Sequence, residues 1–462
     1  MTDVGITEQL AGFSADLSFG ELPEAVTARV KQLVLDLLGV AVRARFDVES
    51  TPPMLRAIAA LRWDRGDCTI IGNSGGYAPA AAALANGALA HSLDFDDTHA
   101  AGSLHPSAPI VPAAFAAAEL AGANGADVIA GIVAGYEVQT RLSLALVPSR
   151  HYSQGFHPTA TCGTFGAAAA AGRVLGLSAQ QLQSAFGLCG SMAAGSMQFL
   201  ADGAWNKRFH TGYAAMNGLV AAVTAGQDYR GAGASIEGPA GFLHGYSPSP
   251  EPARAVEALG KRFLTLEIAV KPYPCCRYSH AALDAIIALR AENRIEPRRV
   301  RSIDVGLPLT GQRIIGEPAA AKQRPKNVVD GQFSMAFVAA VALREGRMSW
   351  DDYGRHLIDP ETLELCERVS THPDPMAEAE FPQNMSARVR IETADGSCEK
   401  FVRVPKGEPD NFMTDAELAE KFRSLCAPYL AAAELDATRA ALASFEQVHD
   451  IGSVLARLAP AR

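Results

Sequence analysis

Apolar residues recur at intervals of three and four through the first half of the chain, which is the spacing of a buried helix face. One such series runs from Val26 to Leu38 behind Pro23, a residue suited to the first turn of a helix. Ser178 and Gln181 have the spacing of a capping box, so another helix is expected after residue 178. Similar runs extend from Pro79 to His91, from Asp127 to Leu146 and from Pro158 to Leu175. Their high alanine content permits close packing, so the pattern predicts a large all-helical domain.

The periodicity changes near residue 246. The prolines of the SPSPEP stretch at residues 247–252 cannot continue a helix, so this stretch predicts a connection. Beyond it, apolar residues alternate at 266–270 and again at 303–307, as they do in a half-buried strand. Between these two segments, Ser279 is placed to cap a helix that carries several leucines and isoleucines. The pattern of residues in the middle of the chain therefore predicts both strands and helices.

A hairpin and a final helical segment complete the pattern. Val389 and Ile391 form one predicted arm of the hairpin, Asp395-Gly396 lies near the turn, and residues 401–404 form the other arm. Helix returns at Thr414, where Glu417 completes a second capping box, and this tail is expected to pack back on the first domain. The fold class is therefore α+β and mainly helical, with a smaller α/β domain in the middle of the chain.

Composition excludes several classes of protein. The chain has 462 residues, of which 48% are hydrophobic and 20% charged, as in an ordinary globular protein. Its net charge of −9 argues against nucleic acid or an anionic membrane as a partner. The eight cysteines are scattered, which is typical of reduced thiols, and the N-terminal decapeptide MTDVGITEQL has no targeting character. We therefore expect a cytoplasmic protein without a membrane span.

Titratable residues concentrate in one segment, HSLDFDDTHAAGSLHPS, from His91 to Ser107. His91 and Asp94 are three positions apart and would share one face of a helix. A carboxylate that binds one ring nitrogen fixes the tautomer of an imidazole and raises the basicity of the other nitrogen, as a general base requires. We expect Asp96 and Asp97 mainly to cap backbone amides in the turn that follows.

A divalent metal site is the alternative for this segment. Asp96, Asp97, His99 and His105 all carry ligand atoms, although their spacing is not diagnostic and no HExxH, DDxxD or EF-hand pattern is present. A metal-dependent hydrolase is therefore a remote alternative function.

Other candidate residues lie outside this segment. His157 stands directly before Pro158 at a predicted helix start, where unpaired amides favour an anionic group. Lys207 lies at a loop-to-helix junction, and Lys271 lies at the end of an apolar segment. Together with Arg208 and His210, these lysines supply the local positive charge with which an acidic protein can bind a polycarboxylate.

Five motifs closely resemble the MmgE/PrpD family, which includes 2-methylcitrate dehydratase, cis-aconitate decarboxylase and iminodisuccinate epimerase. They are AHSLDFDDTH with HPS, GFHPTATCGTFGAAAAAGRVLGL, DGAWNKRFHTG, EGPAGFL and KPYPCCRYSHAALDA, and they extend to about residue 290. The resemblance implies a helical domain from both chain ends, residues 1–262 and 405–462, and a lid domain at 263–404. It also implies a homodimer and an active site without metal or organic cofactor.

The same resemblance assigns active-site residues. In the decarboxylase branch, these residues fall on Asp94, Thr98, His105, His157, Lys207 and Lys271 of this sequence. The loop between Thr98 and His105 looks a residue longer than in that branch and resembles that of the broad bacterial membership, whose substrates are diverse. The function expected first is therefore a cofactor-independent hydro-lyase on a 2-methylcitrate-like di- or tricarboxylate. An epimerase of the iminodisuccinate type and a cis-aconitate-type decarboxylase are the alternatives.

These residues divide into three expected roles. Lys207, Lys271 and Thr98 would bind substrate carboxylates, with Arg208 and His210 close by. His105 and His157 would act as acid and base, in an order that the sequence leaves open. Asp94 would orient one imidazole.

Overall fold

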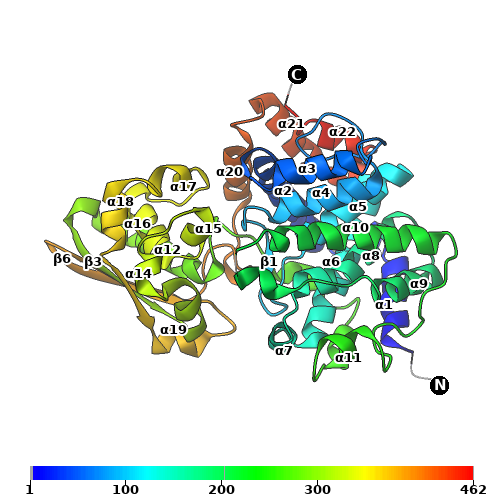
Figure 1. Cartoon of the computed structure of the whole chain (residues 1–462), viewed down its shortest axis with the longest axis horizontal. Helices are drawn as coiled ribbons and strands as arrows, with labels where there is room; N and C mark the ends of the chain where they lie inside the picture. Colours follow the sequence, from blue (N-terminus) through cyan, green and yellow to red (C-terminus); the bar gives the residue numbers. More distant parts are fainter. Residues whose placement is uncertain (1–3, 202, 461–462) are drawn as a thin grey trace. The chain divides into compact units, whose positions relative to one another are not determined.

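The computed structural model describes residues 4–201 and 203–460 and divides into two compact units (Figure 1). Unit 1 comprises Met1–Ala269 and Thr414–Arg462, and unit 2 comprises Val270–Met413. Both units are built mainly from helices, with two small sheets, so the predicted fold class is confirmed.

Helices form the body of unit 1. They are α1 (Ile6–Asp16), α2 (Glu24–Asp47), α3 (Thr51–Ala60), α4 (Pro79–His91), α5 (Ser107–Ala121), α6 (Gly125–Leu146), α7 (Pro148–Ser153), α8 (Pro158–Val174), α9 (Ala179–Cys189), α10 (Asn206–Gly226), α11 (Phe242–Tyr246), α20 (Asp415–Cys426), α21 (Ala432–Ala443) and α22 (Ile451–Ala456). The predicted helix starts at Pro79 and Pro158 are confirmed. So are the capping boxes of α9 and α20.

Close contact between helix backbones positions the site. A Cβ atom on Gly87 of α4 would lie 2.8 Å from the Cα of Gly212 on α10, so these two helices meet where neither has a side chain. Glycine is required at such an approach because any side chain would force the helices apart. The contact brings the start of α10 alongside the end of α4.

The C-terminal tail packs against the first helices of unit 1, as predicted. Lys421 of α20 forms a buried ion pair with Asp36 of α2 at 2.6 Å and donates to the carbonyl oxygen of Phe95 at 2.9 Å. Because a buried charge is stable only when it is paired, the tail and α2 are tied together here. The bond to Phe95 anchors the chain beside Asp94 and Asp96.

The strand predicted at residues 266–270 is mostly absent. Residues 266–270 are expected to alternate as a strand, but Leu264–Glu267 form a 3₁₀ turn and β2 spans only Ile268–Ala269. Glu137 accepts hydrogen bonds from both the amide and the hydroxyl of Thr265, which holds this stretch in a turn. The short β2 pairs antiparallel with β1 (Thr98–His99).

Unit 2 contains a four-stranded sheet in the order β4-β3-β5-β6. The strands are β3 (Val300–Leu307), β4 (Val369–Pro373), β5 (Ala387–Thr393) and β6 (Gly396–Val402). Strands β3 and β4 are parallel, whereas β5 pairs antiparallel with both β3 and β6. The strand at 303–307 and the hairpin with its turn near Asp395-Gly396 are therefore confirmed, but the second arm begins at Gly396 and ends at Val402 instead of spanning residues 401–404.

Short helices accompany this sheet, and buried residues of α12 and α16 form its core with β3 and β5. They are α12 (His280–Asn293), α13 (Leu309–Gly311), α14 (Ala319–Lys322), α15 (Val328–Gln332), α16 (Met335–Glu345), α17 (Asp351–His356), α18 (Pro360–Cys366) and α19 (Pro375–Glu380). A π-helical turn, η7, spans Gln312–Gly316. Ser279 precedes α12 but accepts no capping hydrogen bond, because a 3₁₀ turn at Arg277–Ser279 comes first.

Among the described residues, none of the helices combines the length and the apolar character that a membrane span requires.

Candidate active site

Helix α4 ends at His91, and the chain then turns instead of continuing as a helix. Asp94 has a φ angle of +52°, in the left-handed region that non-glycine residues seldom adopt. The prediction that His91 and Asp94 share one face of a helix is therefore wrong. The turn separates the carboxylates of this segment and gives each a different partner.

Asp96 is the carboxylate that holds the imidazoles. Its Oδ2 atom hydrogen-bonds His91 Nδ1 at 2.7 Å and lies 3.2 Å from His105 Nδ1. The rings of His91 and His105 are 4.4 Å apart, edge to face. Asp96, which was expected mainly to cap backbone amides in the turn, instead contacts both imidazoles, whereas the orienting role of Asp94 stays a prediction. His91 and Asp96 are thus site residues that the sequence analysis ranked too low.

Burial and charge set the protonation of this group. Burial lowers the pKa of His91 to about 4, which outweighs the opposing effect of Asp96. Burial alone would raise the pKa of Asp96, but His91 and His105 hold it well below its usual value. A neutral His91 and an ionised Asp96 therefore face each other at neutral pH. The Nε2 atom of His91 is buried and has no hydrogen-bond partner among the described residues.

A second pair of imidazoles continues the cluster. His157, directly before α8, has its Nδ1 atom 3.3 Å from Nδ1 of His210 on α10. Its ring lies 6.2 Å from that of His91. Burial, followed by the charges of His91 and Lys207, holds the pKa of His157 well below its usual value, and burial lowers that of His210 to about 4. One Nδ1 atom must donate and the other accept, so the two rings hold complementary tautomers.

Lys207 supplies a fixed positive charge. Its Nζ atom lies 2.6 Å from Asp94 Oδ1, and it belongs to the first turn of α10. Burial alone would lower the pKa of Lys207, but the Asp94 carboxylate raises it, so the ammonium group stays charged. An ammonium group has three donors, and those not used by Asp94 can bind an anionic substrate.

Asp97 and His99 shape the loop. Asp97 accepts hydrogen bonds from the amide and the hydroxyl of Ser107, the first residue of α5, which agrees with the predicted capping role. Burial raises the pKa of Asp97 to about 8. His99 Nδ1 accepts from the amide of Gly102 at 3.0 Å. Both residues hold the chain that carries Thr98 and His105.

The remaining predicted residues differ in their surroundings. Thr98 is 8% exposed, and its hydroxyl oxygen is buried and has no hydrogen-bond partner among the described residues. Arg208 instead donates to the hydroxyl of Ser50 at 3.1 Å. Lys271 belongs to unit 2, and its part in the site stays a prediction.

The four residues considered above as metal ligands do not form one set. Asp97 and His99 are engaged with Ser107 and Gly102, whereas His91, Asp96 and His105 offer ligand atoms within 4.8 Å of one another. The shortest contact in that group, 2.7 Å between His91 and Asp96, is a hydrogen bond. A metal ion would have to displace it. The donor geometry thus fits an imidazole–carboxylate network better than a ligand shell.

Burial of His91 predicts a loss of stability in acid. The unfolded chain binds a proton at this imidazole below about pH 6.5, but the folded protein does so only near pH 4. The contribution of His91 to the free energy of unfolding is therefore complete above pH 6.5 and is lost as the pH falls toward 4. The loss is about 2 kcal/mol at pH 5. Urea denaturation of the wild type and of His91→Gln at pH 7.5 and pH 5 tests this. The variant should lose part of the pH dependence, whereas equal dependence in both proteins would contradict the prediction.

Comparison with known proteins shows the family of this chain. Residues 8–255 match the MmgE/PrpD N-terminal domain and residues 273–447 match the MmgE/PrpD C-terminal domain. The chain belongs to the MmgE/PrpD family.

Several curated proteins are similar along almost their whole length. A cis-aconitate decarboxylase-like protein, oryM, of Aspergillus oryzae is 29% identical, covering 98% of this chain and 96% of its own. Cis-aconitate decarboxylase of Aspergillus terreus is 29% identical over 91% of this chain and 89% of its own. The mouse cis-aconitate decarboxylase is 26% identical over 98% of this chain and 93% of its own. Family and relatives together make the protein an enzyme of the lyase class.

Proposed function

We propose that the protein is a lyase that acts on a small polycarboxylate and eliminates water from a 2-methylcitrate-like hydroxy acid, using only its own side chains. The observation that carries this proposal is the arrangement of two imidazole pairs in unit 1. His91 and His105 share Asp96, and His157 contacts His210. An elimination needs one group to remove a proton from carbon and another to protonate the leaving hydroxyl. Two separate imidazole pairs supply both.

His105 is the proposed base. Its side chain is 14% exposed, whereas that of His91 is fully buried, so a substrate can reach His105 more readily. With Nδ1 turned toward Asp96, its Nε2 atom is available to take a proton from the carbon next to a carboxylate. The ionised Asp96 then stabilises the imidazolium that forms.

His157 is the proposed acid. The low pKa of its ring keeps it neutral, so it acts through an N–H group rather than as an imidazolium. If His210 donates from Nδ1 to Nδ1 of His157, the proton of His157 lies on Nε2. A neutral imidazole that donates in this way polarises the leaving oxygen as the C–O bond breaks. His157 then gives its Nε2 proton to the departing hydroxide, which leaves as water, and it regains a proton from the His105 imidazolium, directly or through solvent, before the next turnover. His210 therefore acts as a positioning residue that selects the tautomer of His157.

The carboxylates of the substrate need cationic and neutral donors. As the proton leaves, negative charge builds on the neighbouring carboxylate, and fixed donors lower the barrier by stabilising it. Lys207 and the unpaired hydroxyl of Thr98 fit this role in unit 1. The KPYPCC motif around Lys271, which resembles that of the family, supports the same role for a second lysine.

Decarboxylation of a cis-aconitate-like substrate is the second candidate, favoured by the names of the relatives. It needs one proton delivered to carbon as carbon dioxide leaves. The same imidazoles and Lys207 could serve it, since both reactions place negative charge beside a carboxylate.

Product analysis separates these reactions. The purified protein, treated with a chelator and checked for metal by elemental analysis, is incubated with methylcitrate, citrate, cis-aconitate or iminodisuccinate in heavy water and followed by proton NMR. Elimination gives a new alkene signal from a hydroxy acid, decarboxylation releases carbon dioxide from cis-aconitate, and epimerisation exchanges one C–H without an alkene. Failure to convert any of the four would contradict the proposed substrate class. Activity that disappears with the metal and returns with it would favour the hydrolase alternative.

Lys207→Met should weaken substrate binding. Removing one charged hydrogen bond to a carboxylate is expected to raise KM by at least about tenfold. The exposed Lys261→Met is the matched control, since it removes the same charge at an exposed position that is not among the candidate site residues. Steady-state kinetics of both variants test this. An unchanged KM and kcat in Lys207→Met would contradict the role of Lys207.

A further inference from the structure

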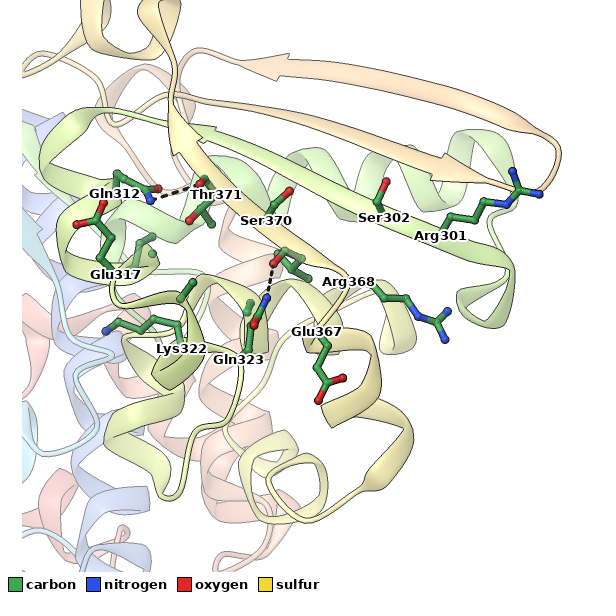
Figure 2. A pocket seen from close by; sticks show the side chains of 15 residues that line it. Arg301, Ser302, Gln312, Glu317, Lys322, Gln323, Glu367, Arg368, Ser370 and Thr371 are labelled. Atoms are coloured by element: carbon green, nitrogen blue, oxygen red, sulfur yellow. Dashed lines mark hydrogen bonds between the residues drawn. The ribbon is translucent and has the colours of Figure 1, made fainter.

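A cavity of about 700 Å³ lies within unit 2 (Figure 2). It is bordered by strand β4 on one side and by η7 and α14 on the other. Its volume is within the range of small-molecule sites. None of the residues that line it is aromatic, so it offers no surface on which a nucleobase could stack. The reaction proposed above makes no use of it.

One buried acceptor in this cavity lacks a partner. Gln312, 6% exposed, donates from Nε2 to the carbonyl oxygen of Thr371 at 3.4 Å. This bond fixes the orientation of the amide, because the reverse orientation would place two oxygens together. The Oε1 atom then accepts no hydrogen bond among the described residues. A buried acceptor without a hydrogen bond costs free energy, so a ligand with an N–H or O–H donor would be stabilised at this atom.

Gly316 keeps this end of the cavity open. A Cβ atom at position 316 would lie 2.4 Å from the hydroxyl oxygen of Thr371 and 2.7 Å from Gln312 Oε1. A side chain here would therefore displace both polar atoms. Gly316 ends the π-helical turn η7, and such turns occur frequently at functional sites.

Opposite charges line the same cavity without pairing to each other. Glu317 is exposed and forms no hydrogen bond or ion pair with the described residues, and Figure 2 shows it beside Gln312 in that view. Lys322 donates to the carbonyl oxygen of Phe333 at 2.7 Å, which leaves two of its three donors available. Burial lowers the pKa of Lys322, and a bound anion would offset that effect. A ligand with an ammonium and a carboxylate group satisfies both residues.

The opposite end of the cavity carries two arginines and one glutamate. Figure 2 shows Arg301, Arg368 and Glu367 there, away from Lys322 and Glu317, and Glu367 is ion-paired with Arg324. Arg368 is bound to the carbonyl oxygen of Val300 and to Glu364, whereas Arg301 is exposed. A second carboxylate on the ligand would be attracted to this end. An uncharged sugar would use none of these charges.

We propose that this cavity is a second ligand site, which binds an acidic α-amino acid. The ammonium group donates to Gln312 Oε1 and Glu317, the α-carboxylate accepts from Lys322, and the side-chain carboxylate extends toward the arginine end of the cavity without contacting Arg301 or Arg368. The proposal concerns unit 2 and is independent of the lyase reaction.

Calorimetric titration of the full-length protein tests the ligand chemistry with three matched probes. L-glutamate, 2-hydroxyglutarate and glutarate differ only in the ammonium, hydroxyl or hydrogen on one carbon. L-glutamate is expected to bind most tightly, and glutarate at least about tenfold more weakly, because it leaves Gln312 and Glu317 unpaired. No binding of L-glutamate, or equal binding of glutarate, would overturn the proposal.

Charge-removing variants locate the site. Lys322→Gln and Glu317→Gln should each weaken L-glutamate binding by about tenfold. The exposed Lys326→Gln, outside the lining, should change it by less than about twofold. Thermal melting checks that each variant is folded. Hydrogen exchange should show protection by L-glutamate at residues 312–323 and 369–371, and protection confined to residues 91–107 and 205–212 would overturn the proposal.

Discussion

Asp96→Asn is expected to lower kcat by at least about 10², the effect of losing one well-placed acid–base group. Asp96 Oδ2 contacts the Nδ1 atoms of both His91 and His105. An amide cannot stabilise an imidazolium as a carboxylate does, and its NH₂ group favours the wrong tautomer of the ring. Steady-state kinetics on the converted substrate give the measurement. The loss should appear in kcat rather than in KM, because Asp96 acts through the imidazoles and not on the substrate.

The neighbouring Asp97 provides the matched control. It is equally buried, but the raised pKa of its carboxyl group, about 8, keeps it mostly protonated at neutral pH, and its partner is Ser107. Asp97→Asn therefore changes little charge, and its kcat should stay within about tenfold of the wild type. Both variants should melt cooperatively. Equal kcat losses in the two variants would mean that Asp96 acts through packing rather than through its charge.

The helices of unit 1 were predictable because their signals are local. Capping boxes at Ser178 and Thr414 depend on two residues three positions apart, and both form as expected. The strand predicted at 266–270 failed because its conformation depends on Glu137, which is distant in sequence. Alternation along the chain contains no information about such a partner.

The candidate site was predictable as a set of residue types but not as a set of contacts. The concentration of carboxylates and imidazoles at 91–107 identified the segment. Which carboxylate meets the imidazoles depends on the left-handed turn at Asp94, a conformation that helix spacing does not predict. The partnership of His157 with His210 depends on the packing of α8 against α10. The cavity in unit 2 was missed because its lining comes from separate segments without a shared motif.

His105→Gln and His157→Gln should each lower turnover by at least about 10² and should separate base from acid. If His105 removes the proton from carbon, His105→Gln abolishes exchange of that hydrogen with heavy water. His157→Gln should keep the exchange but lose elimination, because the leaving hydroxyl is no longer polarised. Proton NMR measures both rates on one sample.

The exposed His244→Gln is the control for loss of an imidazole, and its rates should equal those of the wild type. Exchange that survives in His105→Gln but disappears in His157→Gln would reverse the two roles. Full activity in both variants would remove both histidines from the mechanism. Because the two rings belong to different pairs, the double variant should show the greater loss, since each pair supplies one of the two proton transfers.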